Sequence, residues 1–406
     1  MLNTVFSPWP NYTEEEATAV QKVLLSNKVN YWTGSECRLF EKEFAHWVGV
    51  DYAVALMNGT VALDVALKAL NIGASDEVIV TSRTFIASAS CIVLAGATPV
   101  FADVDENSQN ISAETIRAVI SSRTKAIICV HLAGWPCDMD PIMTLASELG
   151  LFVIEDCAQA HGARYKGRSV GSIGHIGAWS FCQDKIMTTG GEGGMVTTNS
   201  HVFWSRMWAF KDHGKTWEAV IESKSAVDFN WVHQGFGTNW RMTETQAVIG
   251  RIQLKRMNAW HTQRLDNARQ IWDAAEQLSG ISVPIIPDHS EHAAYKCYVF
   301  LVPEQLAYGW TRHRILMAIR ERGVPCYIGS CSEVYLEKAF DGTGFCPPKR
   351  LAVARRLGDT SLMFLVHPTL TREEIEKTSR VLREVMLLAT TRVQIKQTSS
   401  NQMVFS

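Results

Sequence analysis

Short apolar runs alternate with amphipathic stretches from residue 52 onward, and this rhythm predicts an α/β fold. Each run is apolar almost throughout, which is typical of strands buried on both faces. The predicted strands are 52–57, 77–80, 98–102, 125–131, 151–155 and 194–198, and the predicted helices are 60–70, 86–95, 139–149 and 201–210. This alternation indicates a mostly parallel sheet with helices on both faces.

The residues before and after this alternation of strands and helices predict other elements. On the N-terminal side, Thr13-Glu14-Glu15-Glu16 is a capping box that predicts the start of a helix, and a second helix is predicted at 36–47. On the C-terminal side, the predicted elements are a helix over roughly 243–278, a strand at 296–302, and helices at 311–322 and 372–390. We therefore predict three parts: a large domain over 1–255, whose N-terminal segment is free to pack on the next domain, a small α+β domain over 256–392, and a polar tail over 393–406.

One segment has the length of a membrane span but not its composition. Residues 85–102 carry no charged side chain, yet Gly96 and Pro99 interrupt the run and several hydroxyl side chains lie within it. A buried helix at 86–95 and a strand at 98–102 fit this composition better than a transmembrane helix. The N-terminus also lacks the basic and apolar regions of a signal peptide. We therefore expect no membrane partner.

Composition indicates an ordinary globular chain with no nucleic-acid partner. Its 406 residues are enough for two or three domains. The formal net charge of -2 provides no positive field for nucleic acid, so an acidic substrate must be bound by local cations. The ten cysteines are scattered and include no C-x-x-C pair, which is typical of reduced thiols in a cytoplasmic protein.

The strongest chemical signal lies in residues 151–199. An apolar run ends there on Glu155-Asp156, and the carboxyl end of a parallel strand is where open α/β sheets bind ligands. A lone lysine, Lys185, follows, and then Gly190-Gly191-Glu192-Gly193-Gly194, where the backbone can approach a ligand closely. An acid and a lysine thus flank a glycine-dense segment.

Several motifs, in their order along the chain, resemble one enzyme family. They are EDCAQAHGA from Glu155, the G-x-x-G-x-x-G spacing of 171–177, WSF before Lys185, and GGEGG. With Asn58-Gly59-Thr60, Thr84-Phe85 and G-x-N-x-R-M at 237–242, they are similar to the DegT/DnrJ/EryC1/StrS sugar aminotransferases over about residues 5–385. The resemblance implies fold type I of the pyridoxal phosphate (PLP) enzymes, with a mostly parallel sheet flanked by helices in a large domain and a smaller α+β C-terminal domain.

The same resemblance implies roles for residues at the cofactor ring. Lys185 would be the catalytic amine that bonds the PLP aldehyde and later moves protons, whereas alone it would be interpreted as a solvated loop lysine. Asp156 would keep the pyridine nitrogen protonated, with a capping carboxylate as the alternative. Glu155 would then point to the opposite face of the strand. Gln159 would hydrogen-bond the ring hydroxyl.

The phosphate and the ring face have candidates as well. Gly59 and Thr60 open a predicted helix, whose free amides and dipole favour an anion. The resemblance assigns these amides, with the Ser180 hydroxyl, to the PLP phosphate. Phe85 would stack on the pyridine ring, and a core phenylalanine is the alternative. Asn239 would reach the phosphate in a neighbouring subunit, which implies a homodimer with shared active sites.

Four further positions leave their roles open. His161 fits either a residue lining the cleft or a buried, hydrogen-bonded core histidine. His175 stands where the family commonly carries aspartate. Arg241 would contact the substrate or anchor its own loop. At position 185 the chain has lysine, whereas the sugar dehydratases of the family carry histidine, and this favours transamination.

The leading interpretation is an aminotransferase that acts on a nucleotide-linked keto-sugar, with L-glutamate as the donor. The stretches SPWP, WTG and SFCQDKIMTTGGEGGM resemble members of bacillosamine-type pathways, which favours a UDP-linked 4-keto-6-deoxy N-acetylated hexose for surface glycans. A 3-keto-sugar and a dTDP carrier are the alternatives. Substrate contacts are expected from 28–38, 211–217 and 326–336, and the candidate cations for a diphosphate are Lys28, Arg38, Lys211 and Lys215.

Three other interpretations compete with this one. A cysteine desulfurase would use Cys326, Cys331 or Cys346, yet nothing in the sequence predicts a low thiol pKa around them. A metal or protein-docking module over 326–346 is another interpretation, but the same cysteines lack the spacing of a zinc site, and we expect no metal. A non-catalytic PLP-binding regulator would keep Lys185 but convert no keto-sugar.

Overall fold

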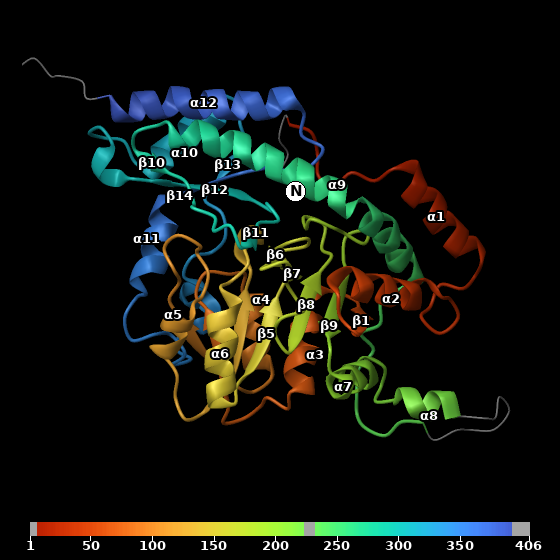
Figure 1. Ribbon diagram of the computed structural model, residues 1–406. Helices are drawn as coiled ribbons and strands as arrows, with labels where there is room; N and C mark the ends of the chain where they lie inside the picture. The colour runs from red at the N-terminus through yellow and green to blue at the C-terminus, as the bar shows by residue number, and fades with distance from the viewer. Residues whose placement is uncertain (1–5, 223–231, 392–406) are drawn as a thin grey trace, which may run out of the picture.

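Seven strands form the sheet at the centre of the larger part of the protein (Figure 1). The computed structural model describes residues 6–222 and 232–391, so the predicted tail at 393–406 lies outside the described residues. The strand order is β1 (Tyr52–Leu56), β9 (Gly194–Thr198), β8 (Ile176–Ser180), β5 (Phe152–Asp156), β4 (Thr124–Val130), β2 (Glu77–Thr81) and β3 (Thr98–Ala102). In this sheet β9 runs opposite to all the other strands, which are parallel to one another, and this confirms the predicted mostly parallel arrangement.

The apolar strands are buried on both faces because successive side chains point to opposite sides. In β4, Ala126 and Ile128 join one hydrophobic cluster, whereas Ile127 and Cys129 join another. The first cluster also contains residues of α3 (Gly59–Ala69), α4 (Ala87–Leu94) and α7 (His201–Lys211), and the second contains residues of α5 (Ala113–Arg117) and α6 (Met139–Leu149). Helices thus cover both faces of the sheet (Figure 1).

The N-terminal helices pack on the long helix that follows the sheet. Thr13 and Glu16 form the predicted capping box of α1 (Glu14–Leu25), and α2 (Glu36–Val48) follows it. Glu16 is buried and forms an ion pair of 2.7 Å with Arg256 of α9 (Glu244–Glu276). The predicted capping box therefore also attaches α1 to α9.

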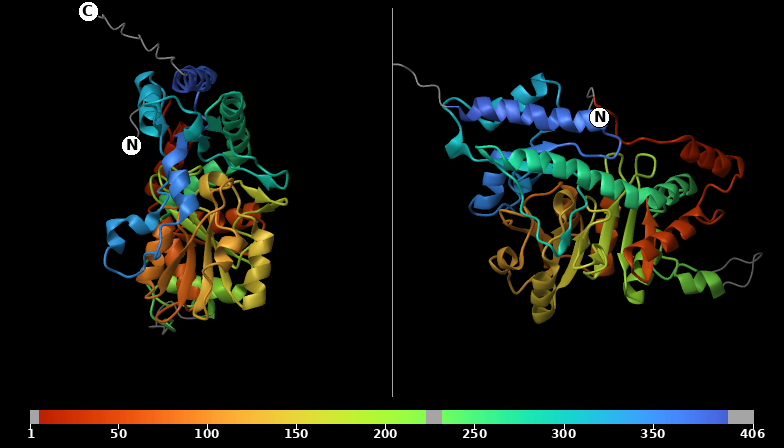
Figure 2. Two further views of the ribbon diagram at one scale, coloured as in Figure 1. Left: turned by 90° about the vertical axis from the view of Figure 1, so that its left-hand side faces the viewer. Right: turned by 45° about the horizontal axis from the view of Figure 1, so that its top comes forward.

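A second, antiparallel sheet lies beyond the first, and α9 runs continuously from one to the other (Figures 1 and 2). Its strands are β10 (Ile281–Ser282), β12 (Cys297–Leu301), β14 (Ser361–Phe364) and β13 (Cys326–Tyr327), and α10 (Arg312–Glu321) and α12 (Arg372–Thr390) pack with it. At the other end of the chain, the Ser7 amide donates to Glu374 of α12 over 2.6 Å. Because α9 passes residue 255 without a break, the predicted division at that residue stays a prediction.

Several short elements have no counterpart among the predicted ones. They are β8, α5, α8 (Trp217–Glu222), α11 (Ala352–Thr360), the strands β10, β13 and β14 of the second sheet, and a small sheet of β11 (Ser290–Glu291), β6 (Arg164–Tyr165) and β7 (Arg168–Ser169). Residues 85–102 form α4, a turn and β3, as predicted. Within 6–222 and 232–391, no helix has both the length and the apolar character needed to cross a membrane.

Candidate active site

The predicted site residues gather at one edge of the large sheet. Gly59 follows β1, Phe85 follows β2, Asp156 ends β5 and Ser180 ends β8, while Lys185 lies in the loop after β8. These four strands point the same way, so their carboxyl ends meet at the same edge. This is the edge where open α/β sheets bind ligands.

Asp156 is a buried carboxylate with few partners. Its Oδ2 accepts a hydrogen bond of 2.8 Å from the Ser88 hydroxyl, and its Oδ1 accepts one of 3.1 Å from the Ala158 amide. Burial raises the pKa of Asp156, and these hydrogen bonds and the Lys185 charge oppose the rise only in part. A cation placed against Asp156 would therefore stabilise its ionised form.

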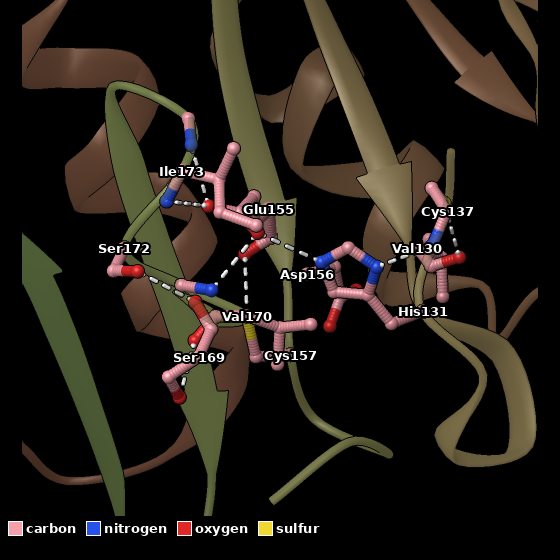
Figure 3. Close-up of polar contacts among 12 residues, drawn as sticks. Val130, His131, Cys137, Glu155, Asp156, Cys157, Ser169, Val170, Ser172 and Ile173 are labelled. Carbon is pink, nitrogen blue, oxygen red and sulfur yellow. Dashed lines mark hydrogen bonds and ion pairs between the residues drawn. The ribbon is translucent and has the colours of Figure 1, made fainter. Parts of the chain in front are cut away.

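Glu155 is buried and points to the other face of the strand, and both of its carboxylate oxygens accept hydrogen bonds (Figure 3). The Cys137 amide donates to His131 Nδ1 over 3.0 Å, so His131 carries its proton on Nε2 and donates it to Glu155 over 3.0 Å. The remaining donors to the Glu155 carboxylate are the amides of Gly171, Ile173 and Gly174. Burial alone would raise the pKa of Glu155, but these donors outweigh it and lower that pKa.

The same cluster has the composition of a metal site. Ligand atoms of His131, Glu155 and Cys157 lie within 4.8 Å of one another. The Glu155 oxygens, however, already accept hydrogen bonds from His131 and from the turn at 171–174. These contacts explain the cluster as an anchor of β5 that holds the neighbouring Asp156 in place.

An anion cradle forms where α3 meets β8. The Asn58 side chain caps α3 by accepting from the Val61 amide over 3.0 Å, and the first amides of a helix have no partner within the helix. A Cβ on Gly59 would lie 2.5 Å from Ser180 Cβ, so only glycine lets α3 approach the Ser180 hydroxyl this closely. Free amides, a helix dipole and a hydroxyl together suit a phosphate group.

Gln159 is held by the turn after β4. Its Oε1 accepts a hydrogen bond of 2.9 Å from the Ala133 amide, which leaves its NH₂ group available as a donor. Ala133 has a left-handed backbone, with φ 58, and its carbonyl accepts from the Tyr295 amide over 2.9 Å. This turn thus connects Gln159 to the segment before β12.

Lys185 is mostly buried and has an acidic and an aromatic neighbour. Its Nζ lies 3.8 Å from Asp184 Oδ1 and 5.3 Å from the centre of the Tyr295 ring. The Tyr295 hydroxyl donates to the other oxygen of Asp184. On the backbone side, the Lys185 carbonyl accepts from the Trp9 indole over 2.8 Å. These contacts exclude the interpretation of Lys185 as a solvated loop lysine.

Phe85 and Asn239 are both exposed. Phe85 is 66% exposed, so the alternative of a core phenylalanine is wrong. Asn239 pairs through its backbone with Asp212, and Arg241 forms an ion pair with the buried Asp212 carboxylate. Arg241 therefore anchors its own loop, and the Asn239 side chain is left at the surface.

The structure also places three further residues from the sequence analysis, Lys211, His161 and His175. Lys211, a candidate cation for substrate, is fully buried, with its Nζ 3.5 Å from Glu41, so that prediction is wrong. His161 is buried between Trp179 and Phe181, and the choice between a residue lining the cleft and a core histidine stays a prediction. His175 accepts from the Val153 amide over 3.0 Å and lies away from Asp156, on the β5 backbone.

The cysteines proposed for desulfurase chemistry have unsuitable surroundings. Cys326 is buried, and burial raises its pKa to about 12. Burial also raises the pKa of the Cys331 thiol. Because the thiolate is the nucleophile, raised pKa values count against this alternative.

Sequence reasoning missed Ser88, His131, Tyr295 and Trp9. They come from four separate segments; Ser88 lies near the Thr84-Phe85 motif, and Trp9 lies within the SPWP stretch, which gave no sign of a contact with Lys185. Each acts by supporting a motif residue through a hydrogen bond or a ring contact. Such long-range contacts leave no signal in a single sequence.

Comparison with known proteins identifies the family. The model of the DegT/DnrJ/EryC1/StrS aminotransferase family matches residues 10–383. The crystal structure of an aminotransferase from Psychrobacter cryohalolentis is 61% identical, covers 95% of this chain and 100% of its own, and superposes with a TM-score of 0.93.

Two curated relatives match over most of their length. The spore coat polysaccharide biosynthesis protein SpsC of Bacillus subtilis is 34% identical over 93% of this chain and 96% of its own. A UDP-N-acetyl-3-dehydro-α-D-glucosamine 3-aminotransferase of Acidithiobacillus ferrooxidans is 35% identical over 92% of this chain and 94% of its own. The chain therefore belongs to the DegT/DnrJ/EryC1/StrS family and is a PLP-dependent aminotransferase of nucleotide-linked keto-sugars.

Proposed function

We propose that this enzyme transfers the amino group of L-glutamate to a UDP-linked 4-keto-6-deoxy N-acetylated hexose for surface glycan synthesis. The family supplies the reaction class, whereas the donor, the carrier and the carbon position are our proposal. The name of the Acidithiobacillus relative contains a UDP-linked N-acetylated sugar, which supports the carrier. The name of the Bacillus relative contains polysaccharide biosynthesis, which supports the destination. The SPWP and WTG stretches support the 4-position by resemblance.

One observation carries the proposal: a lysine, a buried carboxylate and an anion cradle converge at one sheet edge. PLP fits these groups, because the cradle at Gly59 and Ser180 suits its phosphate and the poorly compensated Asp156 suits a protonated pyridine nitrogen. The free NH₂ of Gln159 suits the ring hydroxyl. When bound, PLP supplies an aldehyde that takes up the amino group and a ring that accepts electrons.

The chain's own residues then have separate tasks. Lys185 bonds the cofactor through Nζ and, once released, moves a proton at the substrate carbon. Asp184 and Tyr295 hold the Lys185 ammonium in place from one side. Asp156 keeps a proton on the ring nitrogen, and Phe85 covers the ring from the exposed side.

A 3-keto-sugar is the second candidate. The Acidithiobacillus relative is a 3-aminotransferase by name, and it matches this chain over 92% of its length. A dTDP carrier remains the alternative to UDP.

We further propose a cytoplasmic homodimer in which Asn239 of each chain reaches the other chain's PLP phosphate. The exposure of Asn239 at the end of its anchored loop supports this arrangement. All ten cysteines are free thiols, which supports a reducing compartment.

The first test is an absorbance spectrum of the PLP-loaded protein before and after addition of excess L-glutamate. We expect the band at roughly 410 nm to shift to roughly 330 nm as the cofactor takes up the amino group. UDP-linked 4-keto-sugar should then restore the first band faster than a 3-keto-sugar does. Lys185→Ala should abolish the shift, and the exposed Lys255→Ala should preserve it. A yellow protein indifferent to L-glutamate would refute the donor, and faster recovery with the 3-keto-sugar would refute the carbon position.

A further inference from the structure

A cavity beside Lys185 is lined by one lysine and one acidic side chain. It has a volume of about 770 Å³ and lies between the N-terminal segment, the Lys185 loop and the second sheet. Lys296, His367, Trp9 and Asp184 are among its lining residues. Of the described residues that line it, Asp184 alone is acidic. One of its oxygens accepts from the Tyr295 hydroxyl, and the other lies 3.8 Å from Lys185 Nζ.

Lys296 reaches this cavity from β12's N-terminal side without an ion-pair partner among the described residues. Its Nζ lies over the Tyr295 ring, 4.5 Å from the centre, and Lys185 Nζ lies 5.3 Å from the centre of the same ring. Both ammonium groups therefore lie beside the Tyr295 ring. Burial lowers the pKa of Lys296 to about 8, and the Arg264 and Lys185 charges add to this effect against the opposing charge of Asp184.

Arg264 brings a second buried positive charge to the same region. Its side chain is 2% exposed, and its Nε and Nη2 atoms have no hydrogen-bond partner within the described residues. The guanidinium lies 4.9 Å from the centre of the Trp9 ring, and Trp9 itself lines the cavity. A buried guanidinium with unpaired donors is costly, so an anion nearby would stabilise it.

The side chain of His367 brings no charge to the cavity. It lines the cavity, and its ring stacks on Trp9 with the centres 6.0 Å apart. Burial and the charges of Arg264 and Lys296 lower the pKa of His367 to about 3. His367 is therefore neutral near pH 7, and Lys296 and Asp184 are the charged side chains among the described residues that line the cavity.

We propose that this cavity binds a carboxylate of the amino-acid donor, with Lys296 in direct contact and Arg264 reinforcing the charge from behind Trp9. The inference rests on the proposed function and assigns a subsite to its donor. The donor's amine must reach the reacting end of Lys185, and its carboxylates lie only a few bonds from that amine. In a nucleotide sugar the diphosphate is separated from the keto carbon by the sugar ring, so it would lie farther from Lys185.

The test uses glutarate, a dicarboxylate that has no amine and does not react. Titration calorimetry on the PLP-loaded protein should give glutarate binding that Lys296→Met weakens about 10- to 100-fold, the range expected for a lost charged hydrogen bond. Lys296→Arg, which keeps the charge, should retain most of the affinity. Lys255→Met, on the exposed side of α9, should bind glutarate as the original protein does. Matching melting curves and cofactor absorbance would verify that each variant is folded.

Three outcomes would overturn the assignment. They are absence of glutarate binding to the original protein, unchanged binding of both glutarate and UDP in Lys296→Met, and unchanged glutarate binding with a loss of UDP affinity in Lys296→Met. The last result would identify the anion as the nucleotide diphosphate. Failure of the original protein to respond to L-glutamate would refute the proposed donor instead, and the glutarate titration would still report whether the cavity binds carboxylates.

Discussion

Two adjacent carboxylates, Glu155 and Asp156, have opposite surroundings, and we expect their variants to fail in opposite ways. Asp156→Asn removes a charge that burial disfavours, so the fold should survive while turnover falls by about 100-fold or more. Glu155→Gln places an NH₂ group against donors that now serve a carboxylate, and should reduce the free energy of unfolding by about 3 kcal/mol. Urea unfolding and turnover, measured on both variants, separate the two effects.

The control for this pair is Asp266→Asn on the exposed face of α9, which should change neither quantity. An active Asp156→Asn variant would contradict the assigned role at the ring nitrogen. A fully stable Glu155→Gln variant would contradict the role of Glu155 as the anchor of β5.

We expect His161 to make the stability of the protein sensitive to acid. Burial, followed by the charges of Lys185 and Arg264, lowers its pKa from 6.5 to about 3. Between those values the unfolded chain binds a proton that the folded chain does not, so stability falls as the pH falls below about 6.5. Replacing His161 with phenylalanine, between Trp179 and Phe181, should reduce the loss between pH 7 and pH 5 by on the order of 1–2 kcal/mol.

Urea midpoints at the two pH values measure this effect. His46→Gln, at an exposed position, should leave the pH dependence as it is in the original protein. Equal slopes for His161→Phe and the original protein would show that other groups control the acid sensitivity, and the buried His292 would be the next candidate.

At the scale of elements, the approach of α3 to β8 forms the anion cradle. Gly59→Ala would bring a Cβ to 2.5 Å from Ser180 Cβ, and the helix would have to move away from the strand. We expect a loss of about 1–3 kcal/mol in stability from overpacking, against at most ~1 kcal/mol gained from helix propensity. PLP affinity should fall at least tenfold, as measured by titration of absorbance.

Gly73→Ala is the matched control for this substitution. Its added Cβ would meet only the Ala95 carbonyl at 3.7 Å, an ordinary contact. Unchanged PLP affinity in Gly59→Ala would contradict the assignment of the α3 amides to the phosphate.

The elements also differ in whether the apolar pattern of the sequence could predict them. The main strands of the large sheet are nearly continuous apolar runs, and the long helices repeat their apolar positions over many residues, so the positions of both follow from the chain itself. Two-residue strands such as β6 and β13 have no period to detect. β8 was missed because Gly177 interrupts its apolar run, although that glycine packs against Thr197 and Gly171, where a Cβ would clash.

At the scale of the whole molecule, the proposed dimer makes a direct prediction. If Asn239 completes the partner's site, Lys185→Ala and Asn239→Ala chains should each be inactive alone and active together. A mixed dimer would contain one intact site of two, and random mixing would restore about a quarter of the original activity. Turnover after mixing and refolding measures this, and no recovery would contradict shared sites.

The sequence by itself determined the fold class, the family and the motif residues that line the sheet edge. These follow from local periodicity and from short motifs, which survive in the order of the residues. Only the tertiary structure decided that Lys211 is buried rather than bound to substrate, that Arg241 anchors its loop, and that Lys296 and Lys185 both lie beside the Tyr295 ring. The reason is physical: burial and charge pairing depend on residues far apart in the chain, and only folding brings them into contact.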